Sequence, residues 1–169
     1  IPWLAPTFMK LDISDLPSLI GAFALGPMVG VMVQFLKNLL NILIEGTTTG
    51  GVGELANFVV GSVFAFTAGL IYHRKKTFTR ALVGLICGTI AISTTITLAN
   101  YFVIFPLYAK IMGLDMQVFI DMGKAINENI TDLRSLMLLS VVPFNLLKGI
   151  ILTALSLLIY KRVSPILHK

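Results

Sequence analysis

Residues 81–105 read ALVGLICGTIAISTTITLANYFVIF, which is 25 consecutive residues without a charged side chain. The hydrocarbon core of a bilayer is about 30 Å thick, and a helix needs roughly 20 apolar residues to cross it. Residues 81–105 therefore predict a transmembrane helix.

Three further apolar blocks accompany this one. Residues 55–72 carry no charged side chain, residues 136–160 carry only Lys148, and residues 17–44 carry only Lys37. The sequence Gly26-Pro27 interrupts the last of these blocks, and a proline inside a helix removes a hydrogen bond and clashes with the preceding turn. We therefore predict two helices there and five spans in all: about 15–25, 27–44, 55–72, 81–105 and 134–160.

The composition agrees with a membrane protein that forms a single domain over residues 1–169. Apolar residues make up 56% of the 169 residues and charged residues 12%, whereas a soluble domain has about 25% charged residues. The net charge of +5 does not indicate nucleic-acid binding, because the basic residues lie at the ends of the spans. The single cysteine, Cys87, excludes an internal disulfide and a cluster of thiolate metal ligands.

Basic residues predict the orientation of the chain in the plasma (inner) membrane. Seven of the 13 lysines and arginines lie in residues 74–80 and 161–169, which the positive-inside rule places in the cytoplasm with the C-terminus. Five spans with an outer start suggest a missing N-terminal helix, which would make six. The longer connections, residues 1–15, 45–54 and 114–131, then lie outside, where we expect the ligand to enter. Helical spacing of apolar residues in 114–131 predicts a short amphipathic helix there.

Two polar residues of the last span form the strongest candidate site. Asn145 and Lys148 are three residues apart and share a helix face. At about 1.5 Å per residue, Lys148 lies roughly 24 Å along the helix from Asp132, too deep to serve as a surface anchor. We expect both side chains to contact a ligand. The alternative is that Lys148 pairs with an acid or with backbone carbonyls only to hold the bundle together.

Two more residues lie nearer the outer face. Glu54 opens a helix after a glycine-rich loop, where the helix dipole favours an anion, so it contacts a ligand or only caps the helix. Asn100 lies near the outer end of the uncharged span and is expected to contact a ligand. Glu54, Asn100, Asn145 and Lys148 among apolar walls suit a small, flat, mostly neutral molecule with several hydrogen-bonding edges.

Catalytic and metal-binding motifs are missing from the sequence. The loop 46–53 lacks the Lys-Ser/Thr pair of a phosphate-binding loop, and neither HExxH nor a Ser/His/Asp set is present. We therefore expect no catalytic residue, no metal site and no enzyme. Two other classes stay open at this point: an intramembrane enzyme that uses Lys148 or Glu54, and a channel, for which the inner halves of the spans look too apolar.

Four stretches of the sequence resemble a known family. They are Phe8-Met9-Lys10-Leu11-Asp12-Ile13-Ser14-Asp15-Leu16-Pro17, Gly50-Gly51-Val52-Gly53-Glu54-Leu55-Ala56-Asn57, Leu98-Ala99-Asn100-Tyr101 and Pro143-Phe144-Asn145-Leu146-Leu147-Lys148-Gly149. Together they resemble the riboflavin-specific substrate-binding (S) components of energy-coupling factor (ECF) vitamin transporters. The resemblance covers essentially the whole chain.

The resemblance implies an all-α integral membrane protein, a six-helix S-component bundle whose first helix is absent from this chain. It implies an outward pocket that captures riboflavin with high affinity for ATP-driven uptake, with the flavin-binding polar residues at Glu54, Asn100, Asn145 and Lys148. Riboflavin is then the transported substrate and there is no cofactor. The implied partners are membrane lipid, a transmembrane coupling subunit and two cytoplasmic ATPase subunits. The alternative within this architecture is an S component for thiamine or biotin.

Overall fold

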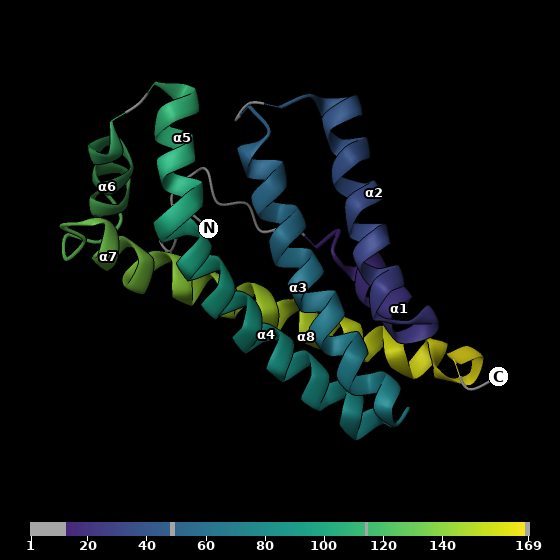
Figure 1. Cartoon of the computed structure of the whole chain (residues 1–169). Helices are drawn as coiled ribbons and strands as arrows, with labels where there is room; N and C mark the ends of the chain where they lie inside the picture. Colours follow the sequence, from purple (N-terminus) through teal and green to yellow (C-terminus); the bar gives the residue numbers. More distant parts are fainter. Residues whose placement is uncertain (1–12, 48–49, 114, 168–169) are drawn as a thin grey trace.

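The computed structural model describes residues 13–47, 50–113 and 115–167, and within these ranges every regular element is a helix (Figure 1). The stretch at residues 8–12, part of the resemblance, lies outside the described residues. The elements are α1 (Leu16–Leu25), α2 (Pro27–Glu45), α3 (Val52–Arg74), α4 (Phe78–Ala99), η1 (Asn100–Ile104), α5 (Phe105–Met112), α6 (Met116–Lys124), α7 (Leu133–Leu136), η2 (Met137–Val141) and α8 (Val142–Leu167).

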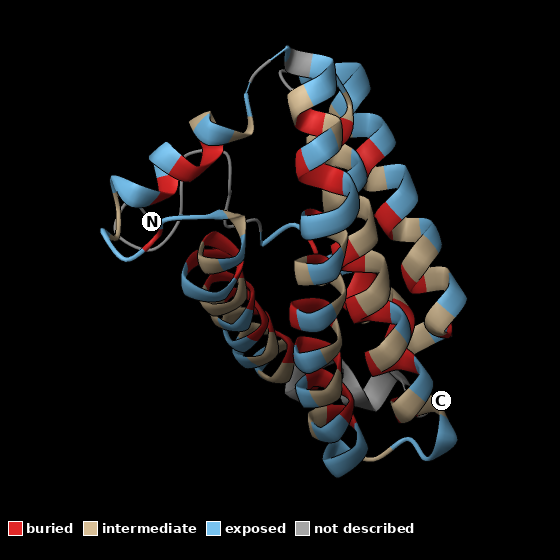
Figure 2. Cartoon of the chain, turned by 60° about the vertical axis from the view of Figure 1, so that its left-hand side comes forward, coloured by how far each residue is buried: buried red, intermediate tan, exposed pale blue. Residues whose placement is uncertain are grey.

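The long helices pack as neighbours along the chain, and α8 then crosses several of them. Helices α1 and α2 form a hairpin at Gly26, α3 packs on α2, and α4 packs on α3. Helix α8 contacts both α4 and α1, so it joins the two ends of this series (Figure 1). Figure 2 shows buried and exposed residues alternating along the helices, as expected where each helix turns one side inward and the other toward lipid.

Four of the described helical stretches are long and apolar enough to cross a membrane: Pro27–Glu45, Val52–Arg74, Phe78–Ile111 and Leu133–Tyr160. The sequence analysis predicted five spans, including residues 15–25. The break at Gly26-Pro27 is present, but α1 has only 10 residues, which rise about 15 Å. The bounds of α1 thus lie within one residue of the predicted 15–25, but this rise is about half the thickness of a bilayer core, so α1 is shorter than the roughly 20 residues that a helix needs to cross it.

Two of the membrane-spanning stretches, Phe78–Ile111 and Leu133–Tyr160, each contain a π-helical segment shortly before a proline. In η1 the N–H of Phe105 donates to the carbonyl of Asn100, and Pro106 follows. In η2 the N–H of Val142 donates to the carbonyl of Met137, and Pro143 follows. A proline has no N–H to donate to the preceding turn. The wider turn of a π segment, with its bonds between residues five apart, accommodates this missing hydrogen bond.

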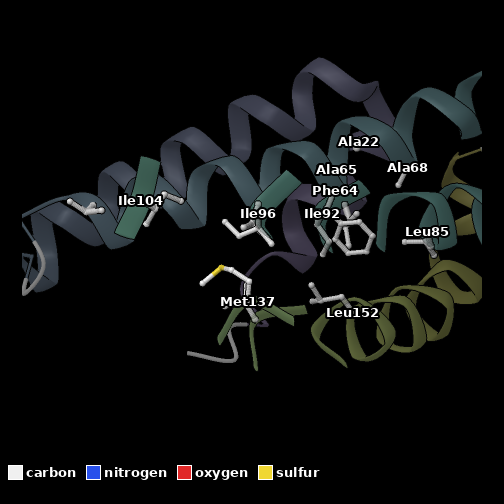
Figure 3. Close-up of a cluster of buried hydrophobic side chains, with 14 of the residues drawn as sticks. Ala22, Phe64, Ala65, Ala68, Leu85, Ile92, Ile96, Ile104, Met137 and Leu152 are labelled. Atoms are coloured by element: carbon white, nitrogen blue, oxygen red, sulfur yellow. The ribbon is translucent and has the colours of Figure 1, made fainter. Parts of the chain in front are cut away.

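Small residues bring the helices into close contact. A Cβ atom on Gly149 of α8 would lie 2.6 Å from Oγ1 of Thr89 on α4, and one on Gly84 of α4 would lie 2.7 Å from the carbonyl oxygen of Ala68 on α3. Such close approach is typical of helix packing in membranes, where van der Waals contact drives association. The apolar core lies along these contacts, and Figure 3 shows part of it, with Phe64 of α3 close to Ile92 of α4.

The outer amphipathic helix is present as α6, and it is shorter than the predicted pattern suggested. Its buried residues are Phe119, Ile120 and Gly123, while Met122 is exposed. Phe119 packs against Phe105, with ring centroids 5.3 Å apart. The two aromatic rings fix α6 on α5 and thereby set which face is buried.

Candidate functional site

Lys148 lies in the middle of α8 and contacts the carboxylate of Asp15, the residue just before α1. The distance from Lys148 Nζ to Asp15 Oδ2 is 2.8 Å, and the two side chains are 3% and 1% exposed. A buried acid partner for Lys148 was the alternative that the sequence left open. Removing both groups from solvent costs free energy, and the contact between the ammonium and the carboxylate offsets part of that cost.

Helix α2 supplies two more groups to the same carboxylate. Oδ1 of Asp15 accepts a hydrogen bond from Nε2 of Gln34 at 2.7 Å and contacts Nζ of Lys37 at 2.5 Å. Asp15, Gln34, Lys37 and Lys148 are called the polar cluster below. It joins α1, α2 and α8 through one carboxylate group, with two lysines opposite one acid.

A glycine of α3 makes room for the polar cluster. A Cβ atom on Gly61 would lie within 1.9 Å of Nε2 of Gln34, so a side chain larger than hydrogen would displace the amide. Nε2 of Gln34 also donates to the carbonyl of Asn57 at 3.3 Å, which ties the cluster to α3. The Oε1 atom of Gln34 is buried and accepts no hydrogen bond from the described residues. A buried carbonyl acceptor of this kind is a place where an incoming donor would gain free energy.

Asn145 lies on α8 one turn before Lys148 and is buried. Its Nδ2 donates to the carbonyl of Val141, a residue of η2, at 2.8 Å. An amide has two N–H donors and one carbonyl acceptor, so this single bond leaves capacity for a ligand. The structure thus places Asn145 and Lys148 on one face of α8, as predicted.

Glu54 and Asn100 lie on other helices. Glu54 is half-buried in the first turn of α3, where Thr47 Oγ1 donates to its Oε2 at 3.0 Å. Asn100 is buried and begins η1. Glu54 therefore lies at a helix start, Asn100 lies in a π segment, and Asn145 and Lys148 lie within a long helix. π segments are frequent at functional sites.

The sequence analysis missed Asp15 and Gln34. It included Asp15 only as the first residue of a predicted span and as part of the first family-like stretch. A signal was present: a buried Lys148 needs a counter-ion, and Asp15 directly precedes the shortest apolar helix. Gln34 carried no such signal, because its role depends on the crossing of α2 and α3 at Gly61.

A separate apolar groove of about 450 Å³ lies between α4 and α8. It is lined by Ile86, Thr89, Ile90, Leu146, Ile150, Thr153, Ala154 and Leu157. At about 100° per residue, Leu146 and Ile150 lie roughly 130° and 170° around α8 from the midpoint between Asn145 and Lys148. The groove is therefore not the predicted polar site, and its exposed isoleucines fit contact with lipid chains.

The described residues contain no group of three or more His, Cys, Asp or Glu side chains that could hold a metal ion. The polar cluster and Asn145 offer several N–H donors and few acceptors. Such a set is suited to a molecule that carries carbonyl or ring-nitrogen acceptors.

Comparisons with known proteins give matches that cover most or all of the chain, and they indicate the same family. Residues 2–160 match the family model described as ECF transporter, substrate-specific component. The chain is 35% identical to the riboflavin transporter RibU of Staphylococcus aureus (strain TCH60), covering 100% of this chain and 82% of that protein. It is 29% identical to the riboflavin transporter FmnP of Bacillus subtilis (strain 168), covering 95% and 79%. A solved structure of the S component of a bacterial ECF transporter superposes with a TM-score of 0.72 at 35% identity, covering 100% of this chain and 85% of the other.

Proposed function

We propose that this chain, which belongs to the family of substrate-specific components of ECF transporters, is a riboflavin-binding subunit of such a transporter. It captures riboflavin with high affinity outside the cell and delivers it to partner subunits for ATP-driven uptake. The observation that carries the proposal is the likeness, over the full chain, to proteins named riboflavin transporters. Membership of this family makes the chain a transport subunit and not an enzyme.

The chemistry of the site supports a flavin. An isoalloxazine ring is flat, largely apolar and neutral, and one edge carries carbonyl and ring-nitrogen acceptors. We assign this edge to Asn145 and Lys148, whose N–H groups are buried on one face of α8. The ribityl chain carries hydroxyl donors, and Glu54 and Asn100 supply carboxylate and amide oxygens that accept from them.

The family also defines the surroundings of the chain. The protein is a multi-pass protein of the plasma membrane and works with an ECF module that has transmembrane and ATPase subunits. We further assign one transmembrane coupling subunit and two cytoplasmic ATPase subunits to that module. The basic residues 74–80 and 161–169 support a cytoplasmic C-terminus and an outward-facing site.

A binding experiment tests the riboflavin assignment. The purified protein in detergent is titrated with riboflavin while flavin fluorescence is recorded, and the titration is repeated with thiamine and biotin as competitors. We expect quenched fluorescence with saturable binding, no competition, and flavin absorbance in protein purified without added ligand. A colourless preparation that shows no affinity for riboflavin, or one that releases riboflavin on addition of thiamine or biotin, contradicts the proposal.

A further inference from the structure

We propose that Asp15 is a positioning residue of the riboflavin site, which acts on the ligand through Lys148. The inference rests on the proposed function, because it assigns a role within the same site. Its basis is the contact between Lys148 Nζ and Asp15 Oδ2 at 2.8 Å, between two side chains that are almost wholly buried.

The carboxylate of Asp15 is directed away from its own helix. Asp15 occupies the N-cap position of α1, where an aspartate side chain usually accepts from the N–H groups of the first turn. Among the described residues it makes no such bond. Its carbonyl oxygen instead accepts from Oγ of Ser18 at 2.7 Å, and its carboxylate faces α2 and α8. A cap alone would not require this orientation.

The carboxylate is held in place independently of Lys148. Oδ1 accepts from Gln34 at 2.7 Å and contacts Lys37, and both of these groups belong to α2. Only Oδ2 faces Lys148. The anion is therefore fixed to α2 and offers its second oxygen as a stationary counter-ion for the ammonium group on α8.

This arrangement makes Lys148 a better donor to a ligand. An isolated ammonium group at this depth in a membrane is costly, and a fixed carboxylate offsets that cost and limits the positions of the flexible side chain. An ammonium has three N–H donors, and one carboxylate oxygen does not occupy all of them. The others can reach the acceptor edge of a flavin. Without Asp15, Lys148 would lose both its counter-ion and its direction.

A double-mutant cycle in riboflavin affinity tests the role of Asp15. The four proteins are the wild type, Asp15→Asn, Lys148→Met and the double variant, each titrated by flavin fluorescence quenching and melted without ligand. We expect Asp15→Asn to weaken binding about tenfold in the wild-type background, because a charge-assisted contact is lost. In the Lys148→Met background we expect the same change to weaken binding less than about twofold.

Two further variants serve as controls. Lys37→Met removes a contact to the same carboxylate from α2 but leaves Lys148 and Asp15 together, so we expect about threefold weaker binding at most. Asp15→Glu keeps the charge, and we expect it to retain more affinity than Asp15→Asn. If Asp15→Asn does not fold, the cycle is run with Asp15→Glu, whose effect must again shrink in the Lys148→Met background.

The outcomes separate this inference from the proposed function. Equal losses from the Asp15 substitution in both backgrounds would show that Asp15 acts only on the fold, and unchanged affinity in both would also overturn the inference. In either case a wild-type protein that binds riboflavin keeps the proposed function. A wild-type protein that does not bind riboflavin overturns the proposed function itself.

Discussion

Lys148 and Gly149 are neighbours on α8 and face two different contacts. Lys148 points to Asp15 at the start of α1, in the polar cluster, whereas Gly149 lies against Thr89 of α4 with no room for a Cβ atom. The first contact has charged groups and an unused acceptor on Gln34, and the second is fully packed. We infer that the side of α8 at Gly149 packs the helices together and that the side at Lys148 is the one that a ligand contacts.

Gly149→Leu should have the largest effect on folding. A Cβ atom there would lie 2.4–2.9 Å from three atoms of Thr89, so α4 and α8 must separate. Overpacking of this kind costs about 1–3 kcal/mol or more, and we expect a clearly lower melting temperature in detergent. Ile150→Ala is the matched control, because Ile150 is exposed on the same helix. An unchanged melting temperature for Gly149→Leu would break the comparison.

Lys148→Met should have the largest effect on binding. Methionine fills a similar volume but has no N–H donor, and Asp15 keeps its contacts to Gln34 and Lys37. Loss of a charged hydrogen bond costs about 1.5–3 kcal/mol, so we expect about 10–100-fold weaker riboflavin binding in a fluorescence titration. The melting temperature should fall less than for Gly149→Leu. Wild-type affinity in Lys148→Met would move the site away from the polar cluster.

Asn145→Ala should have a smaller effect on binding. Its amide already donates to Val141 within the helix, so only part of its capacity is directed to the ligand. We expect a loss of about 1 kcal/mol, or roughly fivefold in affinity, measured by isothermal titration calorimetry. Leu146→Ala, on the lipid-facing groove, is the control and should leave the affinity unchanged. Equal losses for the two variants would indicate a general disturbance of α8 and not a ligand contact.

The smallest effect that we expect is a change in stability at Asp132, the N-cap residue of α7, which precedes η2 and α8. Oδ1 of Asp132 accepts from the N–H of Ser135 at 2.7 Å, and the Ser135 hydroxyl donates to the same oxygen, so these bonds hold the pKa of the Asp132 carboxyl below its usual value. The stabilisation is present above the unfolded-state pKa of this aspartate and is lost as the pH falls through the lowered folded-state pKa.

Asp132→Ala should therefore lower the melting temperature slightly at neutral pH, and the difference from wild type should shrink in acid. Differential scanning fluorimetry, run from neutral pH down through the folded-state pKa of Asp132, measures this difference in melting temperature. Glu128→Ala, an exposed acid before the same helix, is the control. A difference that grows as the pH falls would contradict the sign.

The sequence predicted the helices well because each rests on a local signal. The uncharged run 81–105 and the break at Gly26-Pro27 both appear as expected, and Pro143 coincides with the disturbed backbone of η2. The bounds of α1, Leu16–Leu25, also lie within one residue of the predicted 15–25.

The site was predictable only in part. Lys148 and Asn145 could be proposed from the sequence because an ammonium and an amide three residues apart stand out in an apolar helix. Asp15 and Gln34 are 133 and 114 positions from Lys148 in the sequence, and only the crossing of α1, α2 and α8 brings them together. Long-range contacts of this kind leave no periodic trace in a single sequence.

A structure of the protein with bound riboflavin tests the central claim most directly. We expect the isoalloxazine ring beside α8, with one of its carbonyl or ring-nitrogen acceptors within hydrogen-bond distance of Lys148 Nζ while Asp15 stays on the other side of the ammonium group. A flavin bound elsewhere, with Lys148 still contacting only Asp15 and no space beside it, would contradict the account.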